Sequence, residues 1–418
     1  GQPSFLSGSN KVRQSGRRRR SQRTAWVKGS WCSRRARRGA AIRGCSVLTQ
    51  PAAIYPGSVL TIDLDAVAAN WQSLDARIGE AECGAVVKAN GYGLGQDEVS
   101  RALVVAGCRM FFVATLDEGV RLRGVIGPEH RIYVFNSLPG KETAGDLDAH
   151  NLSPVLNTRE YIEFWSGYAQ NGGRKNTVIE IDTGMNRLGL SPAEAEKIAE
   201  DSGLLAPLSL DFVMSHLSCA DKAADPMNEE QRQLFDKLIS LFPGVPASLA
   251  NSGGIFLGPS YHHDIVRPGA ALYGISEATG SSEPMQQVVG LKAKIMQIRV
   301  VDRESSVGYG ASRRAPKGAR LATVAAGYAD GILRSLGNSG HGYAAGIKVP
   351  VAGRISMDLT TFDVSGVPEN RLLPGDYIDL ICPQYSVDDI ARDAGTIGYE
   401  ILTSLGSRYT RVYEGGAD

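Results

Sequence analysis

Residues 85–95 read AVVKANGYGLG, a short apolar run that ends in a lysine and a glycine-rich turn. Ala85, Val86 and Val87 suit a buried strand, and Lys88 closes this strand where the chain turns. A lysine at the mouth of a core is desolvated, so its amine loses a proton readily and can form a Schiff base with an aldehyde. By itself, a lysine after a strand is more often an ordinary surface residue. Other motifs in the chain are needed to distinguish a surface lysine from one that forms a Schiff base.

Similar apolar runs recur as far as residue 267, with helical stretches between them. Alternating strands and helices predict a parallel sheet, and eight repeats favour a closed (β/α)8 TIM-like barrel of the α/β class over an open sheet. The strands are expected at Ala85–Lys88, Met110–Ala114, Arg131–Phe135, Pro154–Leu156, Thr177–Ile181, Asp211–Ser215, Ala247–Ala250 and Asp264–Arg267.

Such barrels carry their chemistry at the C-terminal ends of the strands. Lys88 ends the first predicted strand, His216 follows the sixth and Arg267 ends the eighth. We therefore expect these three side chains on one rim.

Beyond about residue 288 the pattern changes to alternating or apolar runs with Gly and Pro turns, as in LKAKIMQIRVV and DYIDLI. This pattern predicts a mostly antiparallel β domain over 288–418, after a barrel over 56–287. Short helices are expected near 387–393 and 397–405, followed by a closing strand at 408–413. The first strand, near 58–63, is left open to either domain.

Composition is ordinary for a globular protein of 418 residues, with 43% apolar and 21% charged residues. No apolar run approaches the roughly 20 residues that cross a bilayer, which argues against an integral membrane protein. The six cysteines are scattered, without metal spacing, and are typical of reduced thiols in a cytoplasmic protein.

The N-terminal segment is strongly basic: residues 1–50 hold 13 Lys or Arg and no acid, which leaves 32 basic against 44 acidic residues afterwards. We expect residues 1–55 to be a disordered tail. Three interpretations stay open: an organelle-targeting peptide, a nucleic-acid-binding arm, or translated sequence outside the mature protein.

Three loops on the predicted rim carry polar groups. Arg187 lies in VIEIDTGMNRLGL after the fifth strand, where its fork of donors can bind a carboxylate or phenolate. Asn251 and Ser252 follow strand seven, and Gly269 with Ala270 follows strand eight. Barrels commonly seat a phosphate on the loops after strands seven and eight, so together with Lys88 these loops favour a phosphorylated cofactor.

Two other residues, Tyr309 and His216, carry weaker signals, and two adjacent histidines carry none. Tyr309, between two glycines in VGYGAS, is either presented for a function or an ordinary turn tyrosine. His216 in MSHLSCAD is either a core histidine or a residue that stacks on a ring or tunes another acid. His262 and His263 are adjacent and point apart, so we assign them no role and expect no metal site.

Taken together and in order, these motifs resemble alanine racemase over about residues 57–415. The matching stretches are KANGYG (88–93), DTGMNRLG (182–189), SHLSCAD (215–221), Asn251-Ser252, RPGAALYG (267–274), VGYGAS (307–312), GYADG (327–331) and GRISMD (353–358).

The resemblance implies pyridoxal 5'-phosphate (PLP) bound to Lys88, and a cofactor site that also contains Tyr92, Arg187, His216, Asn251, Ser252, Arg267, Gly269, Ala270 and Tyr399. In this site Arg187 approaches both the cofactor's phenolic oxygen and the substrate carboxylate, and Arg267 faces the pyridine nitrogen. A permanent cation there opposes ring protonation and limits side reactions. Met357 and Tyr328 match substrate-side positions, and Asp221 matches an entrance position.

The family's reaction needs a base on each face of the substrate, because the Cα proton leaves from one face and returns to the other. By resemblance, Lys88 serves one face and Tyr309 of a partner subunit serves the other, with His216 and Arg267 linked to the tyrosine. The implied assembly is a homodimer with shared active sites, acting on a small amino acid and binding neither nucleic acid nor membrane.

Several alternatives remain. The enzyme either supplies D-alanine for peptidoglycan or catabolises it. It is either specific for alanine or a broader amino-acid racemase. A third alternative is a PLP-binding protein without catalysis.

The chain also departs from the family pattern. Leu94 stands where a histidine is usual, Ala270 is smaller than usual, and Glu180 stands where many members have a carbamylated lysine. We expect Glu180 to replace that negative charge and to hydrogen-bond Arg187.

Overall fold

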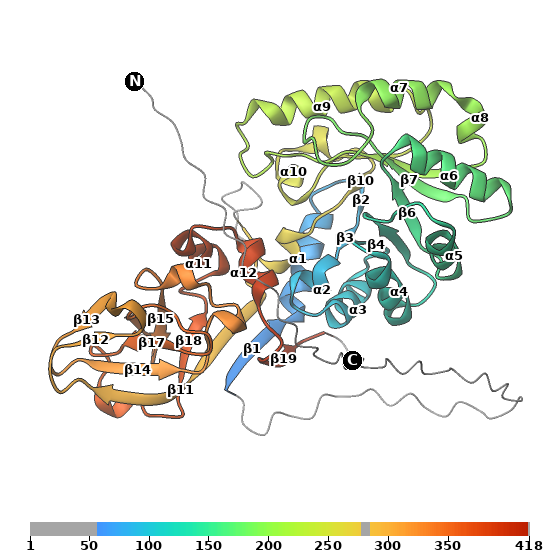
Figure 1. Cartoon of the computed structure of the whole chain (residues 1–418). Helices are drawn as coiled ribbons and strands as arrows, with labels where there is room; N and C mark the ends of the chain where they lie inside the picture. Colours follow the sequence, from blue (N-terminus) through green and yellow to red (C-terminus); the bar gives the residue numbers. More distant parts are fainter. Residues whose placement is uncertain (1–56, 277–284, 417–418) are drawn as a thin grey trace, which may run out of the picture. The chain divides into compact units, whose positions relative to one another are not determined.

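The structure, a computed structural model, describes residues 57–276 and 285–416 (Figure 1). The predicted tail over residues 1–55 lies outside the described residues. A parallel sheet runs in the order β3-β4-β5-β6-β7-β8-β9, and β10 pairs with β2. The bounds of these strands are β2 Glu82–Cys83, β3 Ala85–Val86, β4 Met110–Val113, β5 Arg131–Val134, β6 Ser153–Leu156, β7 Asn176–Glu180, β8 Ser209–Met214, β9 Ala247–Ser248 and β10 Ile265–Val266.

Backbone hydrogen bonds close this sheet into a ring. On one side of β10, Gly84 N–H donates to the Val266 carbonyl (3.0 Å), and on the other, Arg267 N–H donates to the Ala250 carbonyl (2.9 Å). Because β2 and β3 are one strand interrupted at Gly84, the ring follows the eight predicted strands in order. The predicted α/β fold with a TIM-like barrel is confirmed.

Helix α1 precedes the first barrel strand, and the other helices lie between the barrel strands or after them, as the alternation predicted. They are α1 Leu64–Asp75, α2 Lys88–Tyr92, α3 Gln96–Ala106, α4 Leu116–Ile126, α5 Lys141–Ala149, α6 Arg159–Gln170, α7 Pro192–Glu200, α8 Ser202–Leu205, α9 Pro226–Ile239 and α10 Ser252–Phe256, with short 3-10 turns at Pro259–Tyr261 and Ala270–Tyr273. Asp63 caps α1, because its carboxylate accepts from Ala66 N–H at 2.8 Å.

The β domain is mostly antiparallel. Its strands are β11 Val289–Val300, β12 Ser305–Val307, β13 Arg313–Ala315, β14 Arg320–Val324, β15 His341–Ala344, β16 Ile347–Pro350, β17 Thr360–Asp363, β18 Tyr377–Ile381 and β19 Thr410–Glu414. Its α-helices are α11 Val387–Ala394 and α12 Gly398–Ser404, and its 3-10 turns are η4 Tyr309–Ala311, η5 Tyr328–Asp330, η6 Arg334–Leu336 and η7 Glu369–Arg371.

Strand β1, Ser58–Asp63, belongs to this second sheet although it precedes the barrel in sequence. It pairs antiparallel with β11 and parallel with β19, and its residues alternate between buried and half-buried. This alternation is the period of two expected for a strand with one covered face.

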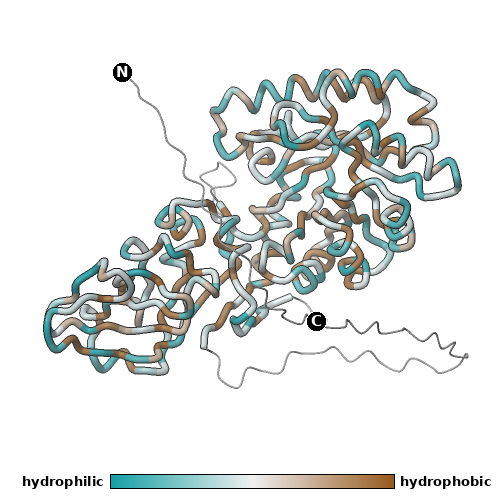
Figure 2. The backbone as a smooth tube through the Cα atoms, in the orientation of Figure 1, coloured by the Kyte–Doolittle hydropathy of each residue, from teal (hydrophilic) through white to brown (hydrophobic). Residues whose placement is uncertain are grey.

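A cluster of aromatic rings fills the barrel interior. Phe112, Tyr133 and Phe212 are fully buried, with ring centroids 4.9 Å to 6.2 Å apart. Hydrophobic residues gather along the barrel strands and alternate with hydrophilic ones along α7 and α9 (Figure 2). The barrel is therefore a packed core that supports its rim.

Two further features bear on the class of protein. None of the helices in the described part of the chain is long and apolar enough to cross a membrane. Cys83, Cys108, Cys219 and Cys382 are free thiols.

Candidate active site

A cavity of about 300 Å³ lies at the C-terminal ends of the barrel strands. Its wall includes all ten residues that the sequence suggested for a cofactor, although they come from six separate segments. The lining residues are Val86, Lys88, Ala89, Tyr92, Phe135, Arg187, His216, Asn251, Ser252, Arg267, Gly269, Ala270, Tyr399 and Thr403.

The segment after Lys88 is a left-handed turn. Ala89, Asn90 and Tyr92 have φ of 53°, 56° and 51°, and Gly91 and Gly93 continue the run at 62° and 85°. Side chains other than glycine rarely adopt this conformation, because their Cβ crowds the carbonyl. The turn therefore ends the strand sharply and leaves Lys88 on the cavity wall.

Glycine is required where α12 approaches this turn. A Cβ on Gly93 would lie 2.4 Å from the Leu402 carbonyl oxygen. The β domain also binds the turn directly, because Arg411 donates to the Gly93 carbonyl (2.7 Å) and the Tyr413 hydroxyl donates to the Leu94 carbonyl (3.0 Å). Leu94, the residue that departs from the family pattern, is fully buried.

Positive charge dominates the cavity wall. Burial lowers the pKa of the Lys88 amine, and the nearby Arg187 guanidinium lowers it further. Burial also lowers the pKa of His216 to about 3, with Arg267 and Arg187 acting in the same direction. His216 is therefore neutral at physiological pH, while the arginines stay charged.

Arg267 is held in one orientation by the ends of two strands. Its guanidinium donates to the Ser248 carbonyl (2.9 Å) and hydroxyl (2.5 Å), and to the Ser215 carbonyl (2.6 Å). Burial lowers the pKa of Arg267 to about 10, and the Glu180 carboxylate opposes this shift. The residue therefore remains a cation that can only donate hydrogen bonds.

Glu180 is buried at the end of β7, and burial raises its pKa against the opposing effects of Arg267 and Arg187. We expected its carboxylate to hydrogen-bond Arg187. Among the hydrogen bonds of residues 57–276 and 285–416 there is none between these two side chains, so that expectation is wrong. Glu180 acts on both arginines as a nearby charge instead.

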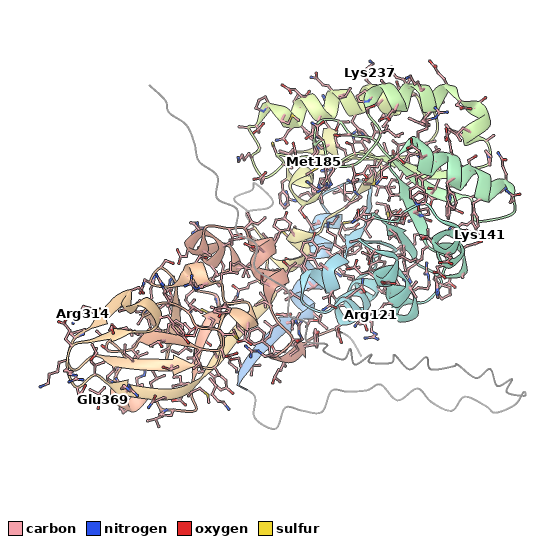
Figure 3. The ribbon with its side chains drawn as sticks, viewed as in Figure 1. Arg121, Lys141, Met185, Lys237, Arg314 and Glu369 are labelled. Atoms are coloured by element: carbon pink, nitrogen blue, oxygen red, sulfur yellow. The ribbon has the colours of Figure 1, made fainter. Side chains whose placement is uncertain are left out.

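The loop that carries Arg187 is shaped by its own sequence. The Asp182 carboxylate accepts from the N–H groups of Gly184 and Met185, each at 2.8 Å. Gly189 has φ of 110°, and a Cβ there would lie 2.7 Å from Asp182 N. Met185, labelled in Figure 3, comes from this loop.

Gln231 joins this loop to the segment after β8, a role that sequence reasoning missed. Its fully buried amide donates to the Thr183 hydroxyl (3.2 Å) and the His216 carbonyl (2.9 Å), while its oxygen accepts from Ser218 N–H (2.9 Å). A polar residue on the inner face of α9 was the available signal.

Donors converge where the loops after β9 and β10 meet. The Ser252 hydroxyl accepts from Gly269 N–H (3.0 Å) and Ala271 N–H (3.2 Å). A Cβ on Gly269 would lie 2.3 Å from the Tyr92 hydroxyl oxygen, so only glycine allows this hydroxyl to approach the loop after β10. Burial raises the pKa of Tyr399 to about 12 and that of Tyr92 further, which keeps both hydroxyls protonated as donors.

Asn251, by contrast, is occupied within its loop. Its oxygen accepts from Gly254 N–H (3.0 Å), and its amide donates to the Leu217 carbonyl (3.1 Å). It therefore caps α10 and lies 3.5 Å from the His216 ring nitrogen.

A second cavity, of about 470 Å³, shares Arg187, His216, Asn251 and Tyr399 with the first. Asp221, the predicted entrance residue, lines this second space.

Three of the four β-domain residues of the predicted site form a separate group, whereas the fourth, Tyr399, lines the cavity. Tyr309, Tyr328 and Met357 are 71%, 43% and 54% exposed, and the described residues that line the two cavities do not include them. Backbone hydrogen bonds join the Tyr328 and Met357 segments, since Ala329 N–H donates to the Met357 carbonyl (2.9 Å). The chain therefore gathers the barrel residues and Tyr399 at one cavity and presents Tyr309, Tyr328 and Met357 elsewhere.

Comparison with known proteins identifies the family. The family model for the alanine racemase N-terminal domain matches residues 62–277, and the model for its C-terminal domain matches residues 288–413. The chain belongs to the alanine racemase family.

Individual alanine racemases agree with this over nearly their whole length. The enzyme of Rhodospirillum rubrum is 49% identical, covering 86% of this chain and 96% of the relative. The catabolic alanine racemase of Mesorhizobium japonicum is 48% identical, covering 86% and 94%. A crystal structure of alanine racemase from Bartonella henselae, with covalently bound pyridoxal phosphate, has 37% identity and a TM-score of 0.82, covering 85% of this chain and 99% of that one. The resemblance read from the motifs is confirmed.

Proposed function

We propose that this chain interconverts L-alanine and D-alanine with PLP held at Lys88. The observation that supports this most strongly is the single cavity in which a lysine amine, a buried arginine and a set of hydroxyl and N–H donors meet. The donors fit a phosphate because Gly269, which has no Cβ, lets the Tyr92 hydroxyl come close to the loop after β10.

We assign the phosphate to Ser252, Tyr92, Tyr399 and the backbone of Gly269 and Ala270. When bound, PLP supplies an electron sink that stabilises negative charge at the substrate Cα. Arg267, assigned to the pyridine nitrogen, donates but cannot give up its proton, so it keeps that sink weak. Arg187, whose guanidinium reaches both cavities, holds the phenolic oxygen and the substrate carboxylate.

Proton transfer on one face is the task of Lys88. Burial and Arg187 lower the pKa of its amine. The neutral amine, which is the form that accepts a proton, therefore requires less free energy than in water. On the other face we assign Tyr309. Its exposure and its absence from the described cavity lining support its delivery to the cavity of a second copy.

The active assembly is accordingly a homodimer in which each cavity receives Tyr309, Tyr328 and Met357 from the partner. A two-fold axis makes the exchange reciprocal, so two complete sites form together. The substrate is a small amino acid, and the free thiols support a cytoplasmic location.

Racemisation of a panel of L-amino acids by the purified protein tests this function. We expect exchange of alanine, borohydride fixation of the cofactor to the peptide that contains Lys88, and loss of both in Lys88→Met. The control Lys237→Met, whose side chain is 72% exposed on α9, should behave as wild type. Turnover of many amino acids would identify a broader racemase, and binding without turnover would identify a non-catalytic PLP protein.

A further inference from the structure

One carboxylate oxygen of Glu118, on α4, takes no part in capping its own helix. Thr115 and Glu118 form a capping box at the start of α4, and Oε2 of Glu118 accepts from the N–H groups of Ala114 (2.8 Å) and Thr115 (3.4 Å). A capping box requires no more than this return contact. The other oxygen, Oε1, accepts from Ala89 N–H at 2.7 Å, across a separation of 29 residues.

Ala89 is the residue that follows Lys88 and begins the left-handed turn. Within the turn, Gly91 N–H donates to the Val87 carbonyl and Gly93 N–H to the Ala89 carbonyl, at 3.0 Å and 2.8 Å. The N–H of Ala89 comes too early in the turn for such a partner, and Glu118 accepts it. At the other end, the Arg411 side chain holds the Gly93 carbonyl.

The same contact places the Glu118 carboxylate next to the residue that carries the amine. The other groups around the amine are Arg187 after β7, His216 after β8, and the Phe135 ring, whose centroid is 5.8 Å from Lys88 Nζ. His216 is neutral, so a carboxylate from α4 acts against the positive Arg187.

We propose that Glu118 is a positioning residue for Lys88, which fixes the peptide after the lysine and holds a carboxylate next to it. This inference rests on the proposed role of Lys88. The pKa of Lys88 agrees with it, because burial and Arg187 lower that pKa while Glu118 raises it.

Glu118→Gln tests both parts, since glutamine offers one oxygen where glutamate offers two, and carries no charge. Loss of a hydrogen bond to a charged acceptor predicts a fall in kcat/KM of roughly tenfold in the PLP-loaded enzyme. Removal of the negative charge favours the neutral amine, so the pKa of Lys88 should move to a lower pH. Acetylation of Lys88 against pH in the full chain freed of cofactor, followed by peptide mass spectrometry, measures this shift independently of activity.

Glu194→Gln is the matched control. Glu194 closes the same kind of capping box with Ser191 on α7, where its carboxylate accepts from Ser191 N–H (2.9 Å) and hydroxyl (2.7 Å). The two variants should lose similar stability to thermal unfolding, but only Glu118→Gln should change kcat/KM and the acetylation profile. Equal behaviour of the two variants in both assays would overturn the proposal.

Glu118→Asp separates the two contributions and stands in if the glutamine variant does not fold. A carboxylate that is one methylene shorter keeps the charge but loses reach, so the acetylation profile should stay nearer wild type than in Glu118→Gln while kcat/KM remains low. A profile at least as displaced as that of Glu118→Gln would overturn the charge role. Failure of the wild type to racemise alanine would instead refute the proposed function and leave the acetylation result standing.

Discussion

Two variants that are inactive alone should restore activity when their subunits are mixed. Lys88→Met removes the amine from the barrel cavity, and Tyr309→Phe removes a hydroxyl from a side chain that is 71% exposed. Because Tyr309→Phe removes one hydroxyl from a side chain that is exposed in the single chain, the stability of that chain should change by no more than about 0.5 kcal/mol, and loss of activity reports on chemistry.

The size of the recovery follows from two-fold symmetry. Random pairing of equal amounts places about half of the dimers in the hybrid form, and each hybrid has one site with intact Lys88 and intact Tyr309, so activity per chain should reach about one quarter of wild type. The second site of each hybrid lacks both groups. Activity against mixing ratio should follow the product of the two fractions, with its maximum at equal amounts.

Subunit exchange after co-expression or joint refolding, followed by an alanine racemisation assay, measures this curve. The double variant Lys88→Met/Tyr309→Phe is the control. Mixed equally with wild type, it forms hybrids in which both sites are broken, so activity per chain should fall to about one quarter and not to the half expected of independent chains. If mixtures of the single variants give only the sum of their separate activities, Tyr309 does not act in the partner's site.

Three other perturbations follow from the geometry of the site. Glu180→Gln removes the charge that opposes the lowered pKa of Arg267, so turnover should weaken, and unchanged steady-state kinetics would count against any role for that carboxylate. Gly189→Ala should lower the free energy of unfolding in urea by more than about 1 kcal/mol, because φ is 110° and the backbone of Asp182 occupies the space that the new Cβ needs. Gly79→Ala is the control: φ is 67°, a Cβ there would have no neighbour within 4 Å, and the loss of stability should be smaller. His216 has a folded pKa of about 3, so between roughly pH 3 and 6.5 only the unfolded chain binds its proton and stability rises with pH. Near pH 5, His216→Gln should reduce the slope of the free energy of unfolding against pH by about 1.4 kcal/mol per pH unit. An identical slope in wild type and variant would contradict a neutral buried imidazole.

Periodicity was enough to predict the barrel, because buried parallel strands leave continuous apolar runs and helices leave their own spacing. Lys88, His216 and Arg267 were expected on one rim for the same reason, and they line one cavity. Helix α5 has little helical signal in its sequence, because KETAGDLDA has few apolar residues and an internal glycine, Gly145. Its buried residues, Ala144 and Leu147, are too few to produce a clear helical pattern.

The supports of the site could not be predicted in the same way, because they depend on contacts between distant segments. Thr115 and Glu118 have the spacing of a capping box, but the sequence does not reveal that the second oxygen binds the peptide after Lys88. Gln231 is likewise an ordinary helix residue until α9 packs against the loop that carries Arg187.

The charges of the cavity indicate why such supports matter for this reaction. Lys88 has to accept a proton, yet Arg187 and burial both favour its neutral form, and too large a shift would leave an amine that binds the proton weakly. Glu118, on α4, opposes the shift at Lys88, and Glu180, at the end of β7, opposes the shift at Arg267. If both carboxylates tune the same electropositive cavity, Glu118→Gln and Glu180→Gln should change the pH dependence of racemisation by more together than either does alone. Profiles for the single and double variants that are identical to wild type would show that the arginines and the lysine set their charge states without them.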